Sequence, residues 1–270
     1  MKNRLNKLYA DNRRASARKF EVVAKADDRE AEVFLYDHIV SSELEAEWWG
    51  GIAPGPFVKA IRDLDVDTIH LRINSPGGSV FAARAMEQAL REHGAKVIVH
   101  IDGIAASAAT FIAMAGEEVI MAKGAMFMIH KAWTGMWGNA NDLRKEADLL
   151  DKIDGTLAET YAAKTGKELA QISEWMAEET WFTADEALEN GFATSIAASD
   201  AKARASARAN AKAWNLSAYA NAPRDPCDEP EPEADPAPTA EPANDQQFAT
   251  EDHRARQQQR LSMLARLSHQ

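Results

Sequence analysis

Hydrophobic and polar positions follow two periods through the middle of the chain. Short runs alternate between apolar and polar residues as half-buried strands do, and longer stretches repeat apolar residues every three or four positions, as one face of a helix does. The predicted strands are residues 32–36, 68–73, 96–101, 119–122 and 127–129, and the predicted helices are residues 57–64, 80–93, 105–115 and 141–164. Strands that alternate with helices indicate an α/β domain built on crossover units.

Several predicted boundaries carry a residue with a known capping or breaking effect. Pro56 precedes the first predicted helix and Gly166 follows the longest one, which are favoured positions for proline and glycine. Residues 183–186, with the sequence TADE, form a capping box and predict one more short helix, closed by Gly191. Gly103 is expected to end the third predicted strand.

The two ends of the chain differ in composition from this middle region. Residues 1–30 form a basic N-terminal arm, which we expect either to be frayed and solvated or to contact a partner. Residues 199–246 begin alanine-rich and basic, as a loose helix or the start of a linker. They continue as a proline-rich acidic linker that cannot bury enough apolar surface to fold and is expected to be disordered. Residues 247–270 predict a short C-terminal helix, so the ordered domain is expected at residues 31–198.

Composition excludes several classes of function. The 270 residues carry a formal net charge of -11, which argues against general nucleic-acid binding, and no apolar run is long enough for a membrane helix. The single cysteine, Cys227, excludes an internal disulfide framework and any multi-cysteine metal site. Neither a histidine pair at metal-binding spacing nor a nucleotide-binding glycine loop is present. We therefore expect a cytoplasmic protein that uses no cofactor or metal and has no nucleic-acid or membrane partner.

Three short motifs supply groups that acyl transfer requires. Ser107 lies in GIAASAA, one turn into a predicted helix, where small neighbours let a substrate backbone come close and helix amides favour an oxyanion. Gly77 and Gly78 lie in NSPGGS, where paired glycines let backbone N–H groups face a ligand. His130 ends a strand in MFMIHK, a rigid place for an imidazole whose pKa suits a general base. Taken alone, the three motifs are better explained as a packed serine, a tight turn and a structural histidine, respectively.

In series, the motifs NSPGGSV, GIAASAA and MIHKAW resemble the Clp protease proteolytic subunit family, and within it the ClpP-like prohead proteases of phages and prophages. The resemblance covers about residues 32–197. It implies a ClpP/crotonase-like α/β fold of repeated β-β-α units, with residues 141–164 as a protruding handle helix, followed here by an acidic C-terminal tail. It further implies Ser107 as the nucleophile and His130 as the general base. The amides of Gly77, Gly78 and Ala108 would form the oxyanion hole.

The third member of the implied catalytic triad is where this sequence departs from the family. The family has an aspartate at the position that Glu179 occupies, counted back from Gly191 without a gap. A glutamate is able to orient a histidine, but its longer arm changes the geometry. Thr180 is the alternative, with its hydroxyl holding the imidazole, and a third possibility is another acid or none. An ordinary solvated acid in a loop is the competing interpretation of Glu179.

The resemblance implies a serine endopeptidase that assembles into a homo-oligomeric ring and cleaves protein or peptide substrates. Because of the tail and the E-T-W sequence, we expect a role in phage or prophage capsid maturation, with capsid or scaffold protein as substrate, in the host cytoplasm or the procapsid interior. One alternative is a housekeeping Clp proteolytic subunit that works under an ATP-dependent AAA+ unfoldase. The other is a capsid scaffold or assembly factor with little or no protease activity.

Overall fold

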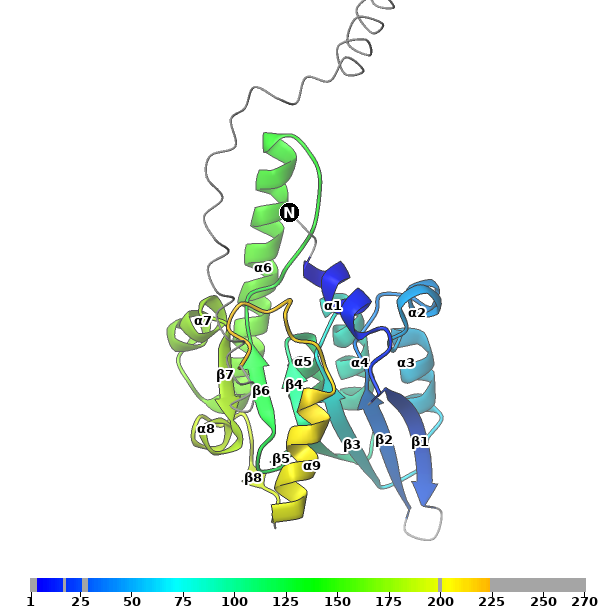
Figure 1. Ribbon diagram of the computed structural model, residues 1–270. Helices are drawn as coiled ribbons and strands as arrows, with labels where there is room; N and C mark the ends of the chain where they lie inside the picture. Colours follow the sequence, from blue (N-terminus) through cyan, green and yellow to red (C-terminus); the bar gives the residue numbers. More distant parts are fainter. Residues whose placement is uncertain (1–3, 17, 26–28, 199–200, 224–270) are drawn as a thin grey trace, which may run out of the picture. The chain divides into compact units, whose positions relative to one another are not determined.

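The computed structural model describes residues 4–16, 18–25, 29–198 and 201–223 (Figure 1). The strands are β1 (Lys19–Lys25), β2 (Glu30–Tyr36), β3 (Thr68–Ser75), β4 (Lys96–Ala106), β5 (Glu118–Met121), β6 (Met126–Ile129), β7 (Thr180–Thr183) and β8 (Ser195–Ile196). The helices are α1 (Arg4–Asn12), α2 (Glu43–Trp49), α3 (Pro54–Arg62), α4 (Val80–Glu92), α5 (Ala108–Ala113), α6 (Ala140–Thr165), α7 (Leu169–Ala177), α8 (Ala184–Glu189) and α9 (Ala201–Lys212).

A mixed sheet joins all of these strands. β2, β3, β4, β5 and β8 are parallel neighbours in that order, and β1 is added antiparallel to β2. β4 is long enough to pair twice on the same side, first with β5 and then, through Ile104–Ala106, with β6. β6 in turn pairs antiparallel with β7. The end of β4 therefore lies between β3 and β6, and the three motifs meet there.

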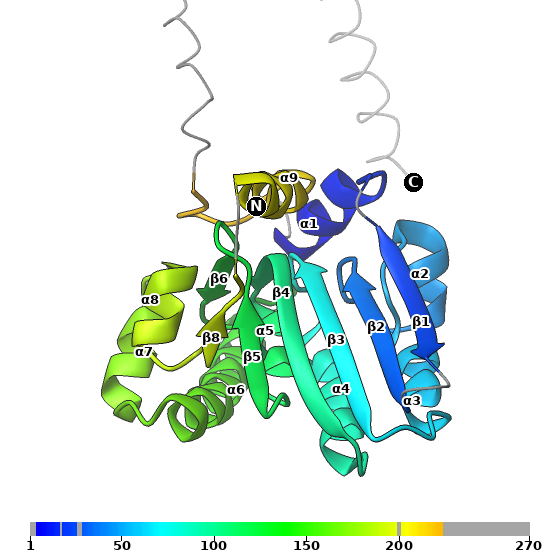
Figure 2. The same cartoon turned by 90° about the horizontal axis from the view of Figure 1, so that it is seen from below.

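Helices cover both faces of the sheet. α3, α4, α5 and α6 pack on one face, whereas α1 and α9 lie on the other (Figure 2). The larger core fills the first face, because α-helices and strands both turn their apolar side there. A smaller cluster on the other face consists of Leu8, Ile104, Ala106, Met128, Trp214, Ala218 and Tyr219. We call it the end cluster, because it joins both ends of the described chain to the end of β4.

The α/β class predicted from the sequence is confirmed, and each strand and helix predicted for the middle of the chain is present within a few residues. Gly166 caps α6 in the left-handed conformation, with φ of 70°. The capping box forms at Thr183 and Glu186, although α8 ends at Glu189, with Asn190 as its C-cap. Sequence periodicity missed β1, β7, β8, α1, α2 and α7, which are short or lie outside the regions with clear patterns.

The prediction that Gly103 ends its strand is wrong, because β4 continues through it to Ala106. Residues 104–106 pair with β6 and are completely buried, so the small apolar sequence there extends the strand and does not begin a helix. A Cβ on Gly103 would lie 2.6 Å from the Cβ of Asn210 and 2.7 Å from Oδ1 of Asn74. The glycine thus permits α9 to approach the sheet closely.

The ends of the chain differ from the expected arm and linker. Leu8 and Tyr9 of α1 are buried, and all of β1 pairs with β2, so residues 4–16 and 18–25 are not a frayed arm. The alanine-rich stretch forms α9, which packs on β4, and the chain after it buries Trp214 and Tyr219. These apolar side chains are few, but each finds a place in a buried cluster. The acidic linker from residue 224 and the predicted C-terminal helix lie outside the described residues.

The predicted handle helix is α6. It begins with a capping box between Asn139 and Asp142, and its first turns extend beyond the sheet in Figure 1. This part exposes Leu143 and Leu149, and Trp137 just before it is 93% exposed. None of the helices in the described ranges is both long enough and apolar enough to cross a membrane.

Candidate active site

Ser107 stands at the junction between β4 and α5. Its N–H donates to the carbonyl of Met128 in β6 at 2.9 Å, so the neighbouring strand fixes its backbone. Its φ of 53° and ψ of -125° lie outside the usual regions for a residue with a side chain, which costs about 1–3 kcal/mol. The prediction that Ser107 lies one turn inside a helix is wrong, because Ser107 is the N-cap of α5. This sharp turn presents its hydroxyl beside the first amides of the helix.

His130 follows the last residue of β6, as predicted. Its Nε2 lies 2.7 Å from Oγ of Ser107. Because Nε2 must accept the serine proton, the imidazole proton belongs on Nδ1 in this pair. Burial, together with the smaller effect of the positive charge of Arg4, lowers the pKa of His130 from 6.5 to about 3. The imidazole is therefore neutral at physiological pH, which is the form a general base needs.

The paired glycines lie directly beside Ser107. A Cβ on Gly77 would lie 2.8 Å from the Cβ of Ser107 and 2.4 Å from the carbonyl oxygen of Ala106. The N–H of Gly77 donates to Oγ of Ser75, whereas in the described part of the chain the N–H of Gly78 has no such partner. Ala108 is the first residue of α5, where a helix leaves its N–H groups without internal acceptors. Gly78 and Ala108 are thus better placed than Gly77 to receive an oxyanion.

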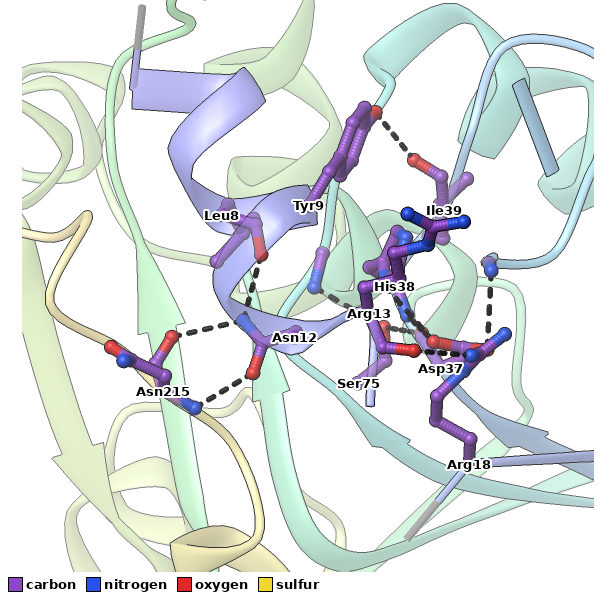
Figure 3. A network of polar contacts seen from close by, with 12 residues as sticks. Leu8, Tyr9, Asn12, Arg13, Arg18, Asp37, His38, Ile39, Ser75 and Asn215 are labelled. Atoms are coloured by element: carbon purple, nitrogen blue, oxygen red, sulfur yellow. Dashed lines mark hydrogen bonds and ion pairs between the residues drawn. The ribbon is translucent and has the colours of Figure 1, made fainter. Parts of the chain in front are cut away.

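A bridge to Ile39 fixes the glycine turn. The N–H of Ile39 donates to the Gly77 carbonyl, and the carbonyl of Ile39 accepts from Ser79, both at 2.8 Å. The Tyr9 hydroxyl of α1 donates to the same Ile39 carbonyl at 2.8 Å (Figure 3). Gly78 has φ of 148°, and a Cβ there would lie 2.0 Å from the Ile39 oxygen. The glycine turn therefore rests on Ile39, an isolated bridge residue that Tyr9 of α1 supports.

The direct contact between Glu179 and His130 that the resemblance implies is not formed in this structure. The Glu179 carboxylate is buried and accepts from the N–H of Ala220 at 3.0 Å and of Asn221 at 2.7 Å. These amides occupy both carboxylate oxygens, and none of the hydrogen bonds in the described chain joins Glu179 to His130. Thr180 does not hydrogen-bond to His130 either, because its hydroxyl donates to the Trp175 carbonyl at 2.8 Å. A catalytic contribution of either residue stays a prediction.

A pocket of about 210 Å³ opens on the serine and histidine. Gly78 and Ser79 line one side of it, and Leu150 and Ile153 of α6 line another. α1 contributes Leu5 and Leu8, and the chain after α9 contributes Tyr219. The walls are mainly apolar, so the pocket suits an apolar side chain of an extended peptide. Across the described residues, no group of three or more metal-ligating side chains is brought together.

Sequence reasoning did not identify the two aromatic rings that contact the His130 imidazole, those of Trp133 and Tyr219. The ring of Trp133 lies 4.5 Å from that of His130, centroid to centroid, and the ring of Tyr219 lies 5.5 Å from it, both edge-on. Trp133 follows His130 by three residues, in the loop between β6 and α6. Tyr219 gave no signal beyond being an aromatic residue in a polar stretch, because its partners are far away in the sequence.

The two ends of the described chain also hold each other. The side-chain amide of Asn12 donates to the Asn215 carbonyl at 2.9 Å, and the N–H of Asn215 donates to Oδ1 of Asn12 at 2.7 Å (Figure 3). Asn12 also donates to the Leu8 carbonyl, which stabilises the end of α1. α1 and the chain after α9 thus form one continuous cover over the end of β4.

Comparison with known proteins gives consistent matches. A family model described as Clp protease matches residues 60–200. The ATP-dependent Clp protease proteolytic subunit 1 of Leifsonia xyli subsp. xyli is 32% identical over 169 residues, which are 61% of this chain and 85% of that protein. The proteolytic subunit 2 of Tropheryma whipplei is 34% identical over 133 residues, covering 48% and 73% of the two chains. The proteolytic subunit 3 of Streptomyces coelicolor is 31% identical over 178 residues, covering 64% and 81%.

Proposed function

Because the chain belongs to the Clp protease family, we propose that it is a serine endopeptidase in which Ser107 is the nucleophile and His130 the general base. The observation that carries this proposal is the 2.7 Å separation of Ser107 Oγ and His130 Nε2, inside a pocket open to a peptide. A serine hydroxyl is a poor nucleophile until a neighbouring base takes its proton, and this pair supplies that base.

In the acylation step, Ser107 Oγ attacks the carbonyl carbon of a peptide bond, and its proton passes to His130 Nε2. The carbonyl oxygen becomes negative and receives hydrogen bonds from the amides of Gly78 and Ala108 in the proposed oxyanion hole, with Gly77 shaping the turn. Loss of one such donor typically reduces the rate by about 10²–10³. His130 then gives its proton to the departing amine, the C–N bond breaks, and the acyl group stays on Ser107.

In the deacylation step, a water molecule gives a proton to His130 Nε2 and attacks the ester carbon. The same two amides stabilise the second tetrahedral oxyanion, and the proton returns to Ser107 Oγ as the acid product leaves. No cofactor or metal is needed for this sequence. Glu179 is proposed to support the imidazole, and Thr180 is the weaker candidate because its hydroxyl is committed to Trp175.

A fluorophosphonate probe tests the proposed activity directly, because it labels only an activated serine. We expect the full chain to be labelled and to hydrolyse a fluorogenic peptide, and Ser107→Ala to do neither while eluting at the same volume from a sizing column. The rate of peptide hydrolysis by Glu179→Gln, measured in the same assay, gives the contribution of the proposed third residue to catalysis. An assembled, unlabelled wild-type protein that also ignores a candidate capsid substrate would favour the scaffold alternative.

We propose that copies of the chain assemble into a ring that encloses the serine. The exposed apolar side chains Trp137, Leu143 and Leu149 around the start of α6 support this proposal, because such a patch on a protruding helix favours burial against another copy. Sedimentation of the full chain tests it. A monomer at micromolar concentration would contradict the proposal.

For the biological substrate we propose capsid or scaffold protein, in phage or prophage head maturation. The support is the long C-terminal extension past the region that the family model matches. A second candidate follows from the relatives, which are named as ATP-dependent Clp proteolytic subunits. Cleavage of a purified capsid precursor without nucleotide would support the first role. A requirement for an AAA+ unfoldase and ATP with folded substrates would support the second.

A further inference from the structure

Tyr219 lies in the chain after α9, beyond the residues 60–200 that the family model matches. It is 5% exposed, and its ring sits among three aromatic neighbours of the active site. The ring centroids lie 5.5 Å from His130, 4.9 Å from Trp133 and 5.8 Å from Trp181. Its hydroxyl donates to the carbonyl of Pro76, the residue before the paired glycines. Tyr219 thus contacts the base and the glycine turn at once.

Glu179 holds the backbone immediately after Tyr219. Its carboxylate accepts from the N–H groups of Ala220 and Asn221, and the side chain of Asn221 donates back to the carbonyl of Glu178. Glu179 has φ of 52°, a left-handed conformation that a glutamate adopts only when its surroundings enforce it. Charge-assisted hydrogen bonds to two consecutive amides are strong enough to fix a segment.

We propose that Tyr219 is a positioning residue of the active site, whose ring holds the His130 imidazole against Ser107, and that Glu179 acts through it by holding the 220–221 backbone. The proposal rests on the serine endopeptidase function proposed above. The third residue of the triad would then orient the base indirectly, through an aromatic ring that the chain supplies from beyond the family's matched region.

The physical reason is that a single hydrogen bond does not fix the plane of an imidazole ring, so packing against neighbouring side chains must fix it. In the described chain, the hydrogen bond of the His130 imidazole is the one that Nε2 accepts from Oγ of Ser107. The rings of Trp133 and Tyr219 contact the imidazole edge-on. Aromatic pairs at such distances contribute about 0.5–1.5 kcal/mol beyond the free energy of burying their area. Burial raises the pKa of the Tyr219 phenol, so its O–H stays protonated and its bond to Pro76 persists at neutral pH.

The same ring shields the imidazole from water. The hydroxyl of Ser107 and the phenol of Tyr219 face His130, and Glu146 of α6 lines the same pocket. From α1 comes Arg4, whose guanidinium lies 5.3 Å from the centre of the Trp133 ring. Removal of the Tyr219 ring would admit water to His130. The pKa of the base would then rise from its lowered value toward the ordinary value of about 6.5.

The test compares Tyr219→Ala with Trp214→Ala, in the full chain. Both remove a buried aromatic ring from the end cluster, but only Tyr219 has a ring contact with His130. We expect Tyr219→Ala to lower kcat at least about tenfold with little change in KM, and to move the acid limb of the pH–rate profile upward by one unit or more. Trp214→Ala should leave that limb in place.

Two conservative variants complete the set. Tyr219→Phe keeps the ring but loses a hydroxyl that bonds to Pro76 and interacts with Ser107, so its kcat should lie between those of Tyr219→Ala and wild type, while the acid limb stays in place. Glu179→Gln keeps an acceptor for one amide but loses the charge, so it should move kcat and the acid limb in the same direction as Tyr219→Ala, by a smaller amount. If circular dichroism shows that Tyr219→Ala does not fold, Tyr219→Leu takes its place with the same expectations.

Three outcomes would overturn the inference. Tyr219→Ala and Trp214→Ala with the same profile would show that Tyr219 only packs. A higher kcat in Tyr219→Ala would show that the segment obstructs the site. An unchanged acid limb in a variant with low kcat would show a loss that does not pass through His130. All three require a wild-type protein that hydrolyses peptide and a dead Ser107→Ala, so failure of the proposed function is recognised separately.

Discussion

Asn12 and Asn215, which stand 203 positions apart in the chain, form a two-way hydrogen-bonded pair. Asn12 is 1% exposed, so its amide has exchanged water for the backbone of Asn215 and the carbonyl of Leu8. The pair joins α1 to the chain after α9 at the point where both cover the end of β4. The cover over the candidate site is therefore held by a polar contact whose loss leaves buried groups unsatisfied.

Asn12→Ala should lower the free energy of unfolding by about 2–3 kcal/mol, because it leaves the N–H and carbonyl of Asn215 without partners. Urea denaturation followed by circular dichroism measures this. Asn141→Ala, at an exposed position of α6, is the control and should change stability by about 0.5 kcal/mol or less. Equal effects of the two substitutions would show that the Asn12 pair contributes nothing.

Gly78→Ala should abolish peptide hydrolysis and destabilise the fold by about 2 kcal/mol or more. The new Cβ would clash with the Ile39 carbonyl, and φ of 148° is strained for any residue with a side chain. Gly155→Ala in α6 is the matched control, since a Cβ there meets nothing within 4 Å. It should stabilise the protein by about 0.5–1 kcal/mol with unchanged activity. An active Gly78→Ala protein would remove the glycine turn from the mechanism.

Acid should destabilise the protein through His130. Its pKa is about 3 in the folded state, so between pH 6.5 and 3 the unfolded chain binds a proton that the folded chain rejects. The stability from the neutral imidazole is fully present above pH 6.5 and is lost as the pH falls, by at most about 1.4 kcal/mol per unit. His130→Gln should flatten this slope when unfolding is measured at several pH values.

His100 should act in the same direction over a narrower range. Burial, with the nearby charge of Arg72, lowers its pKa to about 4. The window in which unfolding takes up this proton is therefore pH 6.5 to 4. His100→Gln should remove that part of the slope without changing the acid limb of activity, because His100 pairs with His70 on the sheet and not with Ser107. An acid limb that shifts in His100→Gln would contradict this separation.

Removal of residues 224–270 should leave peptide hydrolysis intact and impair targeting or assembly. The chain that ends at Pro223 keeps α9, Tyr219 and the amides bound by Glu179. A chain that ends at Lys212 loses those contacts and should lose activity at least about a hundredfold. Peptide assays on the two truncated proteins check this. If the longer one were inactive, the tail would belong to the catalytic unit.

The sequence predicted the α/β class and singled out Ser107, His130 and the glycine turn, although it placed Ser107 inside a helix and not at its N-cap. Each of these lies at the end of a strand whose apolar pattern is local, and local patterns are readable from neighbours in the chain. Gly103 was misinterpreted because a glycine in an apolar run either ends a strand or lets another backbone pack closely against it. The second case holds here, where α9 packs against Gly103.

The partner of Glu179 was not readable in the same way. Counting back from Gly191 assigned Glu179 to the family position, but whether its carboxylate binds an imidazole or two amides depends on a segment some 40 residues later. Tyr219 and α1 escaped prediction for a similar reason. Their sequences are short and polar, and their stability comes from contacts with residues distant in the chain.

The pairing of the two ends has a consequence for the time at which the enzyme would become active. A chain emerges from the ribosome from its N-terminus, at about 5–20 residues per second. Ser107 and His130 are made early, whereas Asn215, Tyr219 and the amides of residues 220 and 221 are made roughly a hundred residues later. A nascent chain thus carries its nucleophile and base before it carries the segment that completes their surroundings, and the site is finished only after residue 221 has been made.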